Sequence, residues 1–359
     1  MTIIASDFKA QSWFSDVREI KLPNKWNNGS EDVDVTSIGY EAFSSCSQLT
    51  NITIPDSVTS IGYEAFSSCS QLTNITIPDS VTGIGDSVFY GCSQLTNITI
   101  PDSVTRIGYD MFHGCSRLTN ITIPDSVTSI GNSAFHGCSR LTNITIPDSV
   151  TSIGYDAFYG CSGLTSVYIT DITKWCNILF SNVNSNPLSY AHNLYLNGDK
   201  ITDLVIPDNV TSIGEYMFVC CSGLTSVTIP SSVTSIGYDA FSGCSELTSV
   251  IIPNSVSNIG QHAFDFCSSI EKAFFTGRTL NQVQAIGYYP WGLNEDVIYA
   301  EKWPDTGEYW NGLIIARRAI DGGPYKETVD GIEWIYYVKD DKSSVYTIDQ
   351  SIIGTVYVP

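Results

Sequence analysis

Basic residues are scarce in this sequence. Its 359 residues include 17 lysines and arginines against 37 aspartates and glutamates, so the net charge at pH 7 is −20. Nucleic-acid binding needs lysine and arginine side chains gathered against phosphates. The composition therefore argues against a nucleic-acid partner, and equally against attraction to an anionic membrane surface.

Long apolar runs are missing as well. No stretch approaches the roughly 18 residues of a membrane-spanning helix, so we expect no membrane insertion. The first residues, MTIIASDFKAQSWFSDVREIKLP, have neither the basic start nor the apolar core of a signal peptide. Either the protein is intracellular, or this chain is a mature or truncated piece of a longer one.

Catalytic signatures are also lacking. The chain has four dispersed histidines and contains no G-x-S-x-G, H-E-x-x-H, phosphate-binding loop or G-x-G-x-x-G motif. Its many serines occupy repeating turn positions rather than a nucleophile constellation. We therefore expect a protein that is not an enzyme and that carries no cofactor and no metal.

Repetition, by contrast, is abundant, with a period of 23 residues. Nine copies each begin with a valine and hold a cysteine in register. The valines are Val35, Val58, Val81, Val104, Val127, Val150, Val210, Val233 and Val256, and the cysteines are Cys46, Cys69, Cys92, Cys115, Cys138, Cys161, Cys221, Cys244 and Cys267. A period of this length predicts one supersecondary unit per repeat, stacked into a solenoid.

One copy, residues 58–80, shows the expected coil. Ile75 and Ile77 alternate with polar residues, which predicts a short strand buried on one face. A second short extended piece is expected at 58–61. The third part is a helical or 3₁₀ turn that faces the core, and its inward residues are Ala65, Phe66, Cys69 and Leu72. The predicted class is thus an α/β solenoid with a parallel sheet.

Several in-register columns have two interpretations. Packing is favoured over disulfides or metal for the cysteines, because stacking points every Cβ the same way. Surface decoration is favoured over a metal pair for His113 and His136. Turn capping is favoured over calcium for two acidic columns, which are Asp56, Asp79, Asp102, Asp125, Asp148 and Asp208, and Glu41, Glu64, Asp110, Asp156 and Asp239.

The open face of the predicted strands is an uncharged lattice of asparagine and threonine. Such a face favours polar adhesion to a partner. Ordering of water or ice is an alternative that the threonine column suggests and the asparagine column weakens. The candidate binding residues on this face are Asn74, Thr76, Asn97, Thr99, Asn120 and Thr122.

The repeat breaks after Ile169, and the broken segment supplies the other candidate site. Departures from a repeat usually lie in loops on one face of a solenoid, so we expect Trp175, Tyr190 and Tyr195 to contact a partner. For the tryptophan itself, packing in the core or over an end coil is favoured over contact with a partner. Residues 194–198 predict a hairpin with a type I′ turn, and the whole segment is either one enlarged coil or two unequal ones.

The repeat divides the chain into five segments. Residues 1–34 form an N-terminal cap, 35–170 are regular repeats and 171–209 are an irregular enlarged repeat. The copies degrade over 210–302, and 303–359 form a β-rich C-terminal cap or the start of a truncated continuation.

The consensus V-T-S-I-G-Y-x-A-F-x-G-C-S-x-L-T-x-I-T-I-P-D resembles the BspA-type (Treponema pallidum-type) leucine-rich repeat, over roughly 35–170 and 201–270. The resemblance implies a curved right-handed solenoid with its strands on the concave side and its helical turns on the convex side. It also implies a surface or secreted protein that binds host matrix proteins or other cells, without catalytic residues. An intracellular scaffold, and a structural or ice-ordering surface protein, remain the alternatives.

Overall fold

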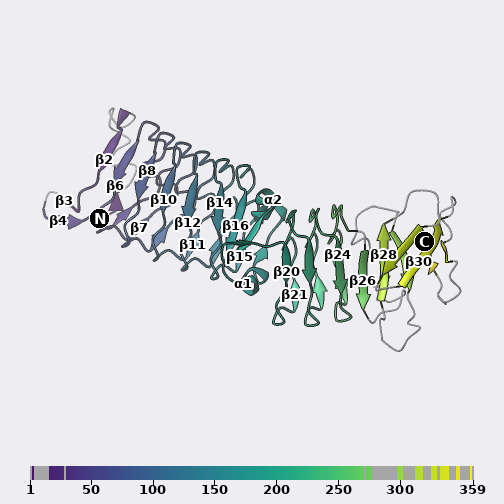
Figure 1. Ribbon diagram of the computed structural model, residues 1–359. Helices are drawn as coiled ribbons and strands as arrows, with labels where there is room; N and C mark the ends of the chain where they lie inside the picture. The colour runs from purple at the N-terminus through teal and green to yellow at the C-terminus, as the bar shows by residue number, and fades with distance from the viewer. Residues whose placement is uncertain are drawn as a thin grey trace. The chain divides into compact units, whose positions relative to one another are not determined.

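The structure is a computed structural model that describes residues 2–3, 16–27 and 30–270, together with seven strands between 272 and 357. The chain forms two compact units, residues 1–200 and 201–359, and each is described by itself. Figure 1 shows the successive coils of both units.

In unit 1, the Asn-Ile-Thr segments of successive coils form the long-strand ladder. Its parallel strands pair residue for residue at the repeat step, so that Asn74, Asn97 and Asn120 are aligned. The ladder consists of β2 (Glu19–Lys21), β6 (Asn51–Thr53), β8 (Asn74–Thr76), β10 (Asn97–Thr99) and β12 (Asn120–Thr122), and of a second sheet with β14 (Asn143–Thr145), β16 (Ser166–Ile169), β18 (Leu194–Leu196) and β19 (Asp199–Lys200). Alternation buries the central isoleucine of each regular strand and exposes both neighbours.

The second extended piece of each coil forms the short-strand ladder. The isoleucine of each regular pair is buried. Its first sheet holds β1 (Thr2–Ile3), β5 (Ser37–Ile38), β7 (Ser60–Ile61) and β9 (Gly83–Ile84), and its second holds β11 (Arg106–Ile107), β13 (Ser129–Ile130), β15 (Ser152–Ile153) and β17 (Leu179–Phe180). The parallel-sheet solenoid predicted from the period is confirmed.

The third side of each coil, here called the turn face, is a run of hydrogen-bonded turns. Residues alternate between two kinds of backbone bond. Ser67 donates to the carbonyl of Glu64 three residues back in its own coil, at 3.0 Å, whereas Phe66 donates to Val88 of the next coil, also at 3.0 Å. This alternation prevents a continuous helix, so the expected helical turn is a series of i→i−3 turns in the regular coils.

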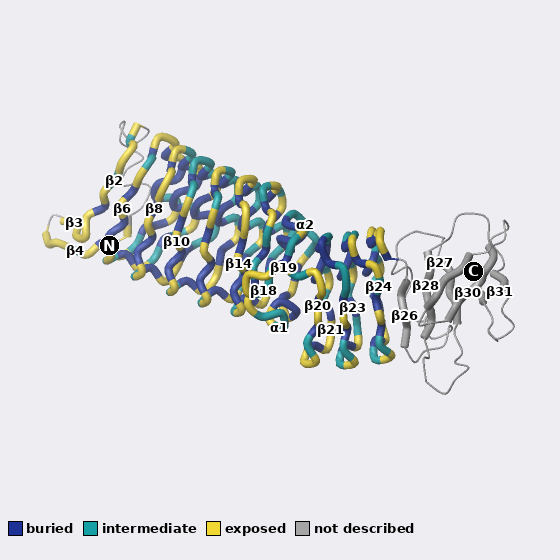
Figure 2. Tube along the Cα trace, viewed as in Figure 1, coloured by how far each residue is buried: buried dark blue, intermediate teal, exposed yellow. Residues whose placement is uncertain are grey.

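Phenylalanine rings fill the core behind the turn face. Phe66 and its neighbours are completely buried, and successive rings stack with centroids 5.2–5.8 Å apart. The cysteines lie beside them, and the Sγ of Cys92 donates to the carbonyl of Phe66 at 3.2 Å. Burial raises the pKa of Cys92 to about 12, so the thiol stays neutral as a packing group. Figure 2 shows this buried interior along the coils.

The broken segment of the sequence folds as one enlarged coil. Val167 of β16 pairs with Leu194 of β18, a step of 27 residues instead of 23. Between them lie α1 (Ile172–Cys176), β17, the 3₁₀ helix η3 (Val183–Ser185) and α2 (Leu188–Ala191). The hairpin β18–β19 follows, with Asn197 at φ 52° and Gly198 at φ 93°, which confirms the predicted type I′ turn.

Unit 2 contains two ladders of the same kinds. Its long strands β20 (Asp203–Val205), β22 (Ser226–Thr228), β24 (Ser249–Ile252) and β26 (Lys272–Thr276) pair in parallel, and β21 (Ser212–Ile213), β23 (Ser235–Ile236) and β25 (Asn258–Ile259) form the short-strand ladder. The strands β28 (Gly312–Arg317), β27 (Val297–Glu301) and β32 (Val356–Tyr357) extend the first sheet by antiparallel pairing. The strands β29 (Tyr325–Val329), β30 (Ile332–Val338) and β31 (Val345–Thr347) form another sheet.

The predicted caps include residues outside the described ranges, and the five segment boundaries stay predictions.

Candidate functional site

The exposed side of the long-strand ladder in unit 1 brings six predicted residues together. Asn74, Asn97 and Asn120 align in one column, and Thr76, Thr99 and Thr122 align in the next. All six are exposed. We call this surface the strand face. It consists of the outward asparagines and threonines of β6 to β14 and of the tyrosines that follow them on β16 and β18.

Hydrogen bonds at the edge of the ladder orient the asparagines. The hydroxyl of Thr73 donates to the carbonyl of Thr50 in the preceding coil at 3.2 Å. The Nδ2 of Asn74 then donates to that hydroxyl at 3.4 Å, and the same pattern recurs at Asn97 and Asn143. Each of these amides is therefore held by its neighbour, which lowers the side-chain entropy that a partner would have to remove.

Two stacked tyrosines end the strand face. Tyr168 takes the register position of Thr145, and Tyr195 follows it on the next strand. Their ring centroids lie 4.8 Å apart with an interplanar angle of 27°. The prediction from sequence includes Tyr195 but not Tyr168. Aligning Ser166–Ile169 with the Asn-Ile-Thr-Ile of the preceding copies reveals the second tyrosine.

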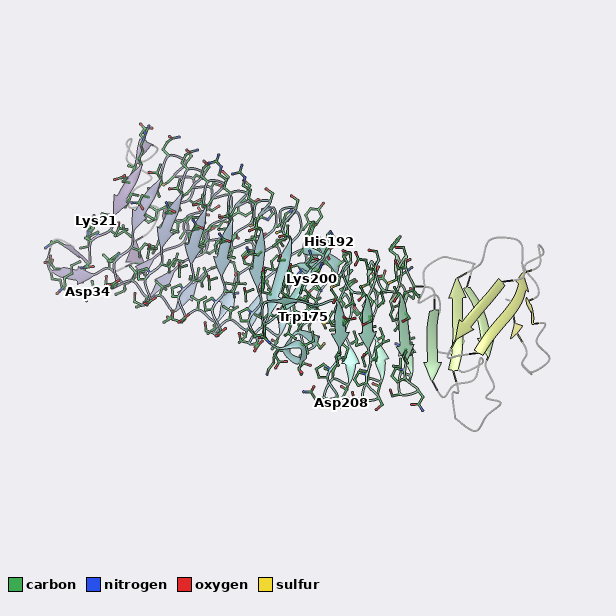
Figure 3. The ribbon with its side chains drawn as sticks, in the orientation of Figure 1. Lys21, Asp34, Trp175, His192, Lys200 and Asp208 are labelled. Carbon is green, nitrogen blue, oxygen red and sulfur yellow. The ribbon has the colours of Figure 1, made fainter. Side chains whose placement is uncertain are left out.

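Trp175 does not belong to this surface. Its side chain is 1% exposed and packs against Phe180 with ring centroids 5.3 Å apart. Asp171 caps the N-terminus of helix α1, since its carboxylate accepts a hydrogen bond from the backbone N–H of Thr173 at 2.7 Å. The expectation that Trp175 contacts a partner is therefore wrong, and the packing alternative holds. Figure 3 labels Trp175 within the enlarged coil.

Tyr190 is half-buried and has a structural partner. Its hydroxyl accepts a hydrogen bond from the backbone N–H of Gly160 at 3.0 Å. In a regular coil the equivalent N–H, that of Gly137, donates to a backbone carbonyl, that of Tyr159, at 2.7 Å. The Tyr190 hydroxyl thus takes the place of the backbone carbonyl that accepts this bond in a regular coil. Burial raises the pKa of Tyr190. Tyr190 closes the turn face, away from the strand face.

Replacing Tyr190 by phenylalanine should destabilise unit 1 by about 1 kcal/mol, because the N–H of Gly160 loses its acceptor. Urea unfolding of the full chain measures this difference. The matched control is Tyr195→Phe, since the described residues show no hydrogen bond to that hydroxyl. It should change stability by less than about 0.5 kcal/mol. Equal unfolding midpoints for the two variants would contradict the role assigned to Tyr190.

Two carboxylates of the second acidic column have side-chain partners within the chain. The carboxylate of Asp156 accepts from the amides of Asn182 and Asn184 at 2.7 and 2.9 Å, and Asp110 pairs with His113 at 3.1 Å. Over the described residues, no three histidine, cysteine or acidic side chains are grouped so that they could hold a metal ion. The rings of His113 and His136 are in contact on the turn face, with centroids 4.3 Å apart and an interplanar angle of 37°.

Helices in the described part of the chain are short. None is both long enough and apolar enough to cross a membrane.

Comparisons with known proteins point to one repeat family. The sequence model of the family described as "BspA type Leucine rich repeat region" matches residues 26–140, 105–194 and 189–290, with six copies. No curated protein matches the chain.

Similar solved structures come from several bacteria. One is a leucine rich cell surface protein from Faecalibacterium prausnitzii, with 24% identity over 76% of this chain and 90% of that chain and a TM-score of 0.40. Another is a leucine-rich repeat protein from Bacteroides ovatus, with 26% identity over 72% and 80% and a TM-score of 0.42. The T. pallidum leucine rich repeat protein shares 20% identity over 75% and 83%, with a TM-score of 0.29.

Proposed function

Because the chain belongs to the BspA-type leucine-rich repeat family, we propose that it binds a protein partner through the strand face of unit 1. We further propose that it acts as an adhesion protein, at a microbial cell surface or in secreted form, toward host matrix proteins or another cell. Membership in a leucine-rich repeat family indicates a protein-interaction repeat protein.

One observation carries the choice of surface. The strand face presents asparagine amides and threonine hydroxyls in register on consecutive strands, and the amides of Asn74 and Asn97 are held by hydrogen bonds. These uncharged groups can hydrogen-bond a partner without the desolvation cost of burying charges. The Tyr168–Tyr195 pair adds an aromatic anchor at the end of the ladder, and tyrosine is enriched in interface cores.

Capture of partners by the immobilised full chain tests this proposal. The panel holds purified extracellular matrix proteins and intact bacterial and epithelial cells. Two variants place the same charge on different faces of two adjacent coils. Thr122 is exposed on the strand face and Thr128 is exposed beside the short-strand ladder. Thr122→Arg should reduce capture at least tenfold, because the bulky cation interrupts the uncharged lattice, and Thr128→Arg should leave capture intact.

Tyr168→Ala combined with Tyr195→Ala should weaken the same capture, because it removes the aromatic anchor. Circular dichroism confirms that each variant is folded. Capture that is unchanged in both strand-face variants would refute the assignment of this surface.

A further inference from the structure

Exposed tyrosines gather on the turn face of unit 1, away from the strand face. They occupy the place that follows the Ile-Gly pair of the repeat, and Tyr40, Tyr109 and Tyr155 are 60%, 52% and 56% exposed. Asp86 and Asn132 take this place in the intervening coils. We call the set Tyr40, Tyr63, Tyr109 and Tyr155 the tyrosine column. Exposed aromatic rings that recur at one place of the coil offer a surface that a partner could contact.

A carboxylate follows every tyrosine of the column. These residues are Glu41, Glu64, Asp110 and Asp156, and all four have a left-handed backbone with φ between 49° and 54°. Their backbone N–H groups are also fixed. That of Glu41 donates to Tyr63 of the next coil at 2.9 Å. Each of these coils therefore presents a ring followed by a carboxylate on the same backbone geometry, and two of the carboxylates also have partners within the chain, Asp110 with His113 and Asp156 with Asn182 and Asn184.

In the Tyr40–Glu41 and Tyr63–Glu64 pairs, the carboxylate is hydrogen-bonded to the hydroxyl of the ring, so the electrostatic potential is negative at that end. The hydrogen bond to Glu41 raises the pKa of Tyr40 to about 12, and Glu64 raises the pKa of Tyr63 in the same way. The phenols of Tyr40 and Tyr63 therefore remain protonated. Asp86, which takes the place of a tyrosine in its coil, is paired with Arg106 at 3.2 Å. The chain as a whole carries a net charge of −20.

We propose that the tyrosine column docks an extended lysine- or arginine-rich segment of a partner protein. A cationic side chain can lie over a tyrosine ring while it pairs with the adjoining carboxylate, and the two attractions reinforce each other. From Tyr40 to Tyr155 the column spans five coil steps, about 24 Å at 4.8 Å per step. That is the length of about seven extended residues. The matching partner is therefore a short basic stretch.

Fluorescence anisotropy with labelled octalysine and the full chain tests the proposal. Tyr109→Ala combined with Tyr155→Ala keeps the charge of the protein and removes two rings. Its affinity should fall roughly fivefold or more. The corresponding double phenylalanine variant keeps the rings and should bind within about twofold of the original chain. Both tyrosines are exposed, so melting curves should show that these variants are folded.

Two substitutions that each remove one negative charge distinguish docking at the tyrosine column from general attraction to an acidic protein. Glu64→Gln removes one negative charge from the column, and Asp79→Asn removes one from an exposed turn between the two ladders. Glu64→Gln should weaken octalysine binding clearly more than Asp79→Asn does. Equal effects of these two substitutions, or unchanged binding after loss of the rings, would overturn the proposal, because the attraction would then depend on net charge alone. Octaglutamate should not bind.

Discussion

Replacing Gly62 by alanine should destabilise unit 1 by about 3 kcal/mol or more. A Cβ on Gly62 would lie 2.7 Å from the carbonyl carbon of Gly39 and 2.8 Å from the backbone nitrogen of Tyr40. Both atoms belong to the backbone of the preceding coil, so neither can rotate away. The glycine is needed because two coils approach closely, and the clash would force the ladder apart. Thermal unfolding followed by circular dichroism measures the loss.

Gly83 provides the matched control. It lies in the next coil on the short-strand ladder, and a Cβ added to it would have the Cβ of Ser60 as its nearest neighbour, at the ordinary contact distance of 3.9 Å. Gly83→Ala should therefore leave stability unchanged or raise it slightly, because alanine reduces the entropy of the unfolded chain. A Gly62→Ala variant that melts together with Gly83→Ala would contradict the close-approach argument.

Replacing Trp175 by alanine should cost about 3–5 kcal/mol of folding stability. The indole is buried in the enlarged coil and packs on Phe180, so its removal leaves a cavity that the surrounding backbone cannot fill. Urea unfolding of the full chain measures the loss, and partner capture at a temperature where the variant is still folded should remain.

Tyr195→Ala is expected to do the reverse. Its ring stacks on Tyr168 at the surface, so the substitution should cost little stability but weaken capture on the strand face. Trp175→Ala should thus lower stability but not capture, and Tyr195→Ala should lower capture but not stability. The comparison distinguishes a residue that packs in the core from one that contacts a partner. A folded Trp175→Ala variant of undiminished stability would show that the indole is not part of the core.

The 23-residue period is sufficient to predict the regular coils. The alternation around Ile75 predicts which side of each strand is buried, and identical copies can only place Asn74 beside Asn97. The structure departs from the prediction at the turn between Ala65 and Leu72. There the residues share their backbone bonds between their own coil and the next, and a pattern confined to one copy cannot show bonds made between copies.

The enlarged coil cannot be predicted in the same way because it occurs once in unit 1. No periodicity indicates which of its aromatic side chains face the core, and the prediction that Trp175 contacts a partner fails for this reason. The role of Tyr190 depends on a bond to Gly160, 30 residues earlier in the chain, and no local pattern encodes such a partner. The tyrosine column, by contrast, follows directly from the repeat, because the residue after each Ile-Gly pair is visible in every copy.

The hairpin β18–β19 has a consequence for self-association. Parallel stacks of nearly identical coils invite a second copy of the chain to add its own coils at an open sheet edge, which is a route to fibres and domain swapping. In unit 1 the last strand of the long-strand ladder, β19, runs antiparallel to its neighbour and carries the exposed charges of Asp199 and Lys200. An incoming parallel strand therefore meets a reversed, charged and very short edge. An edge of this kind disfavours the addition of a further parallel strand.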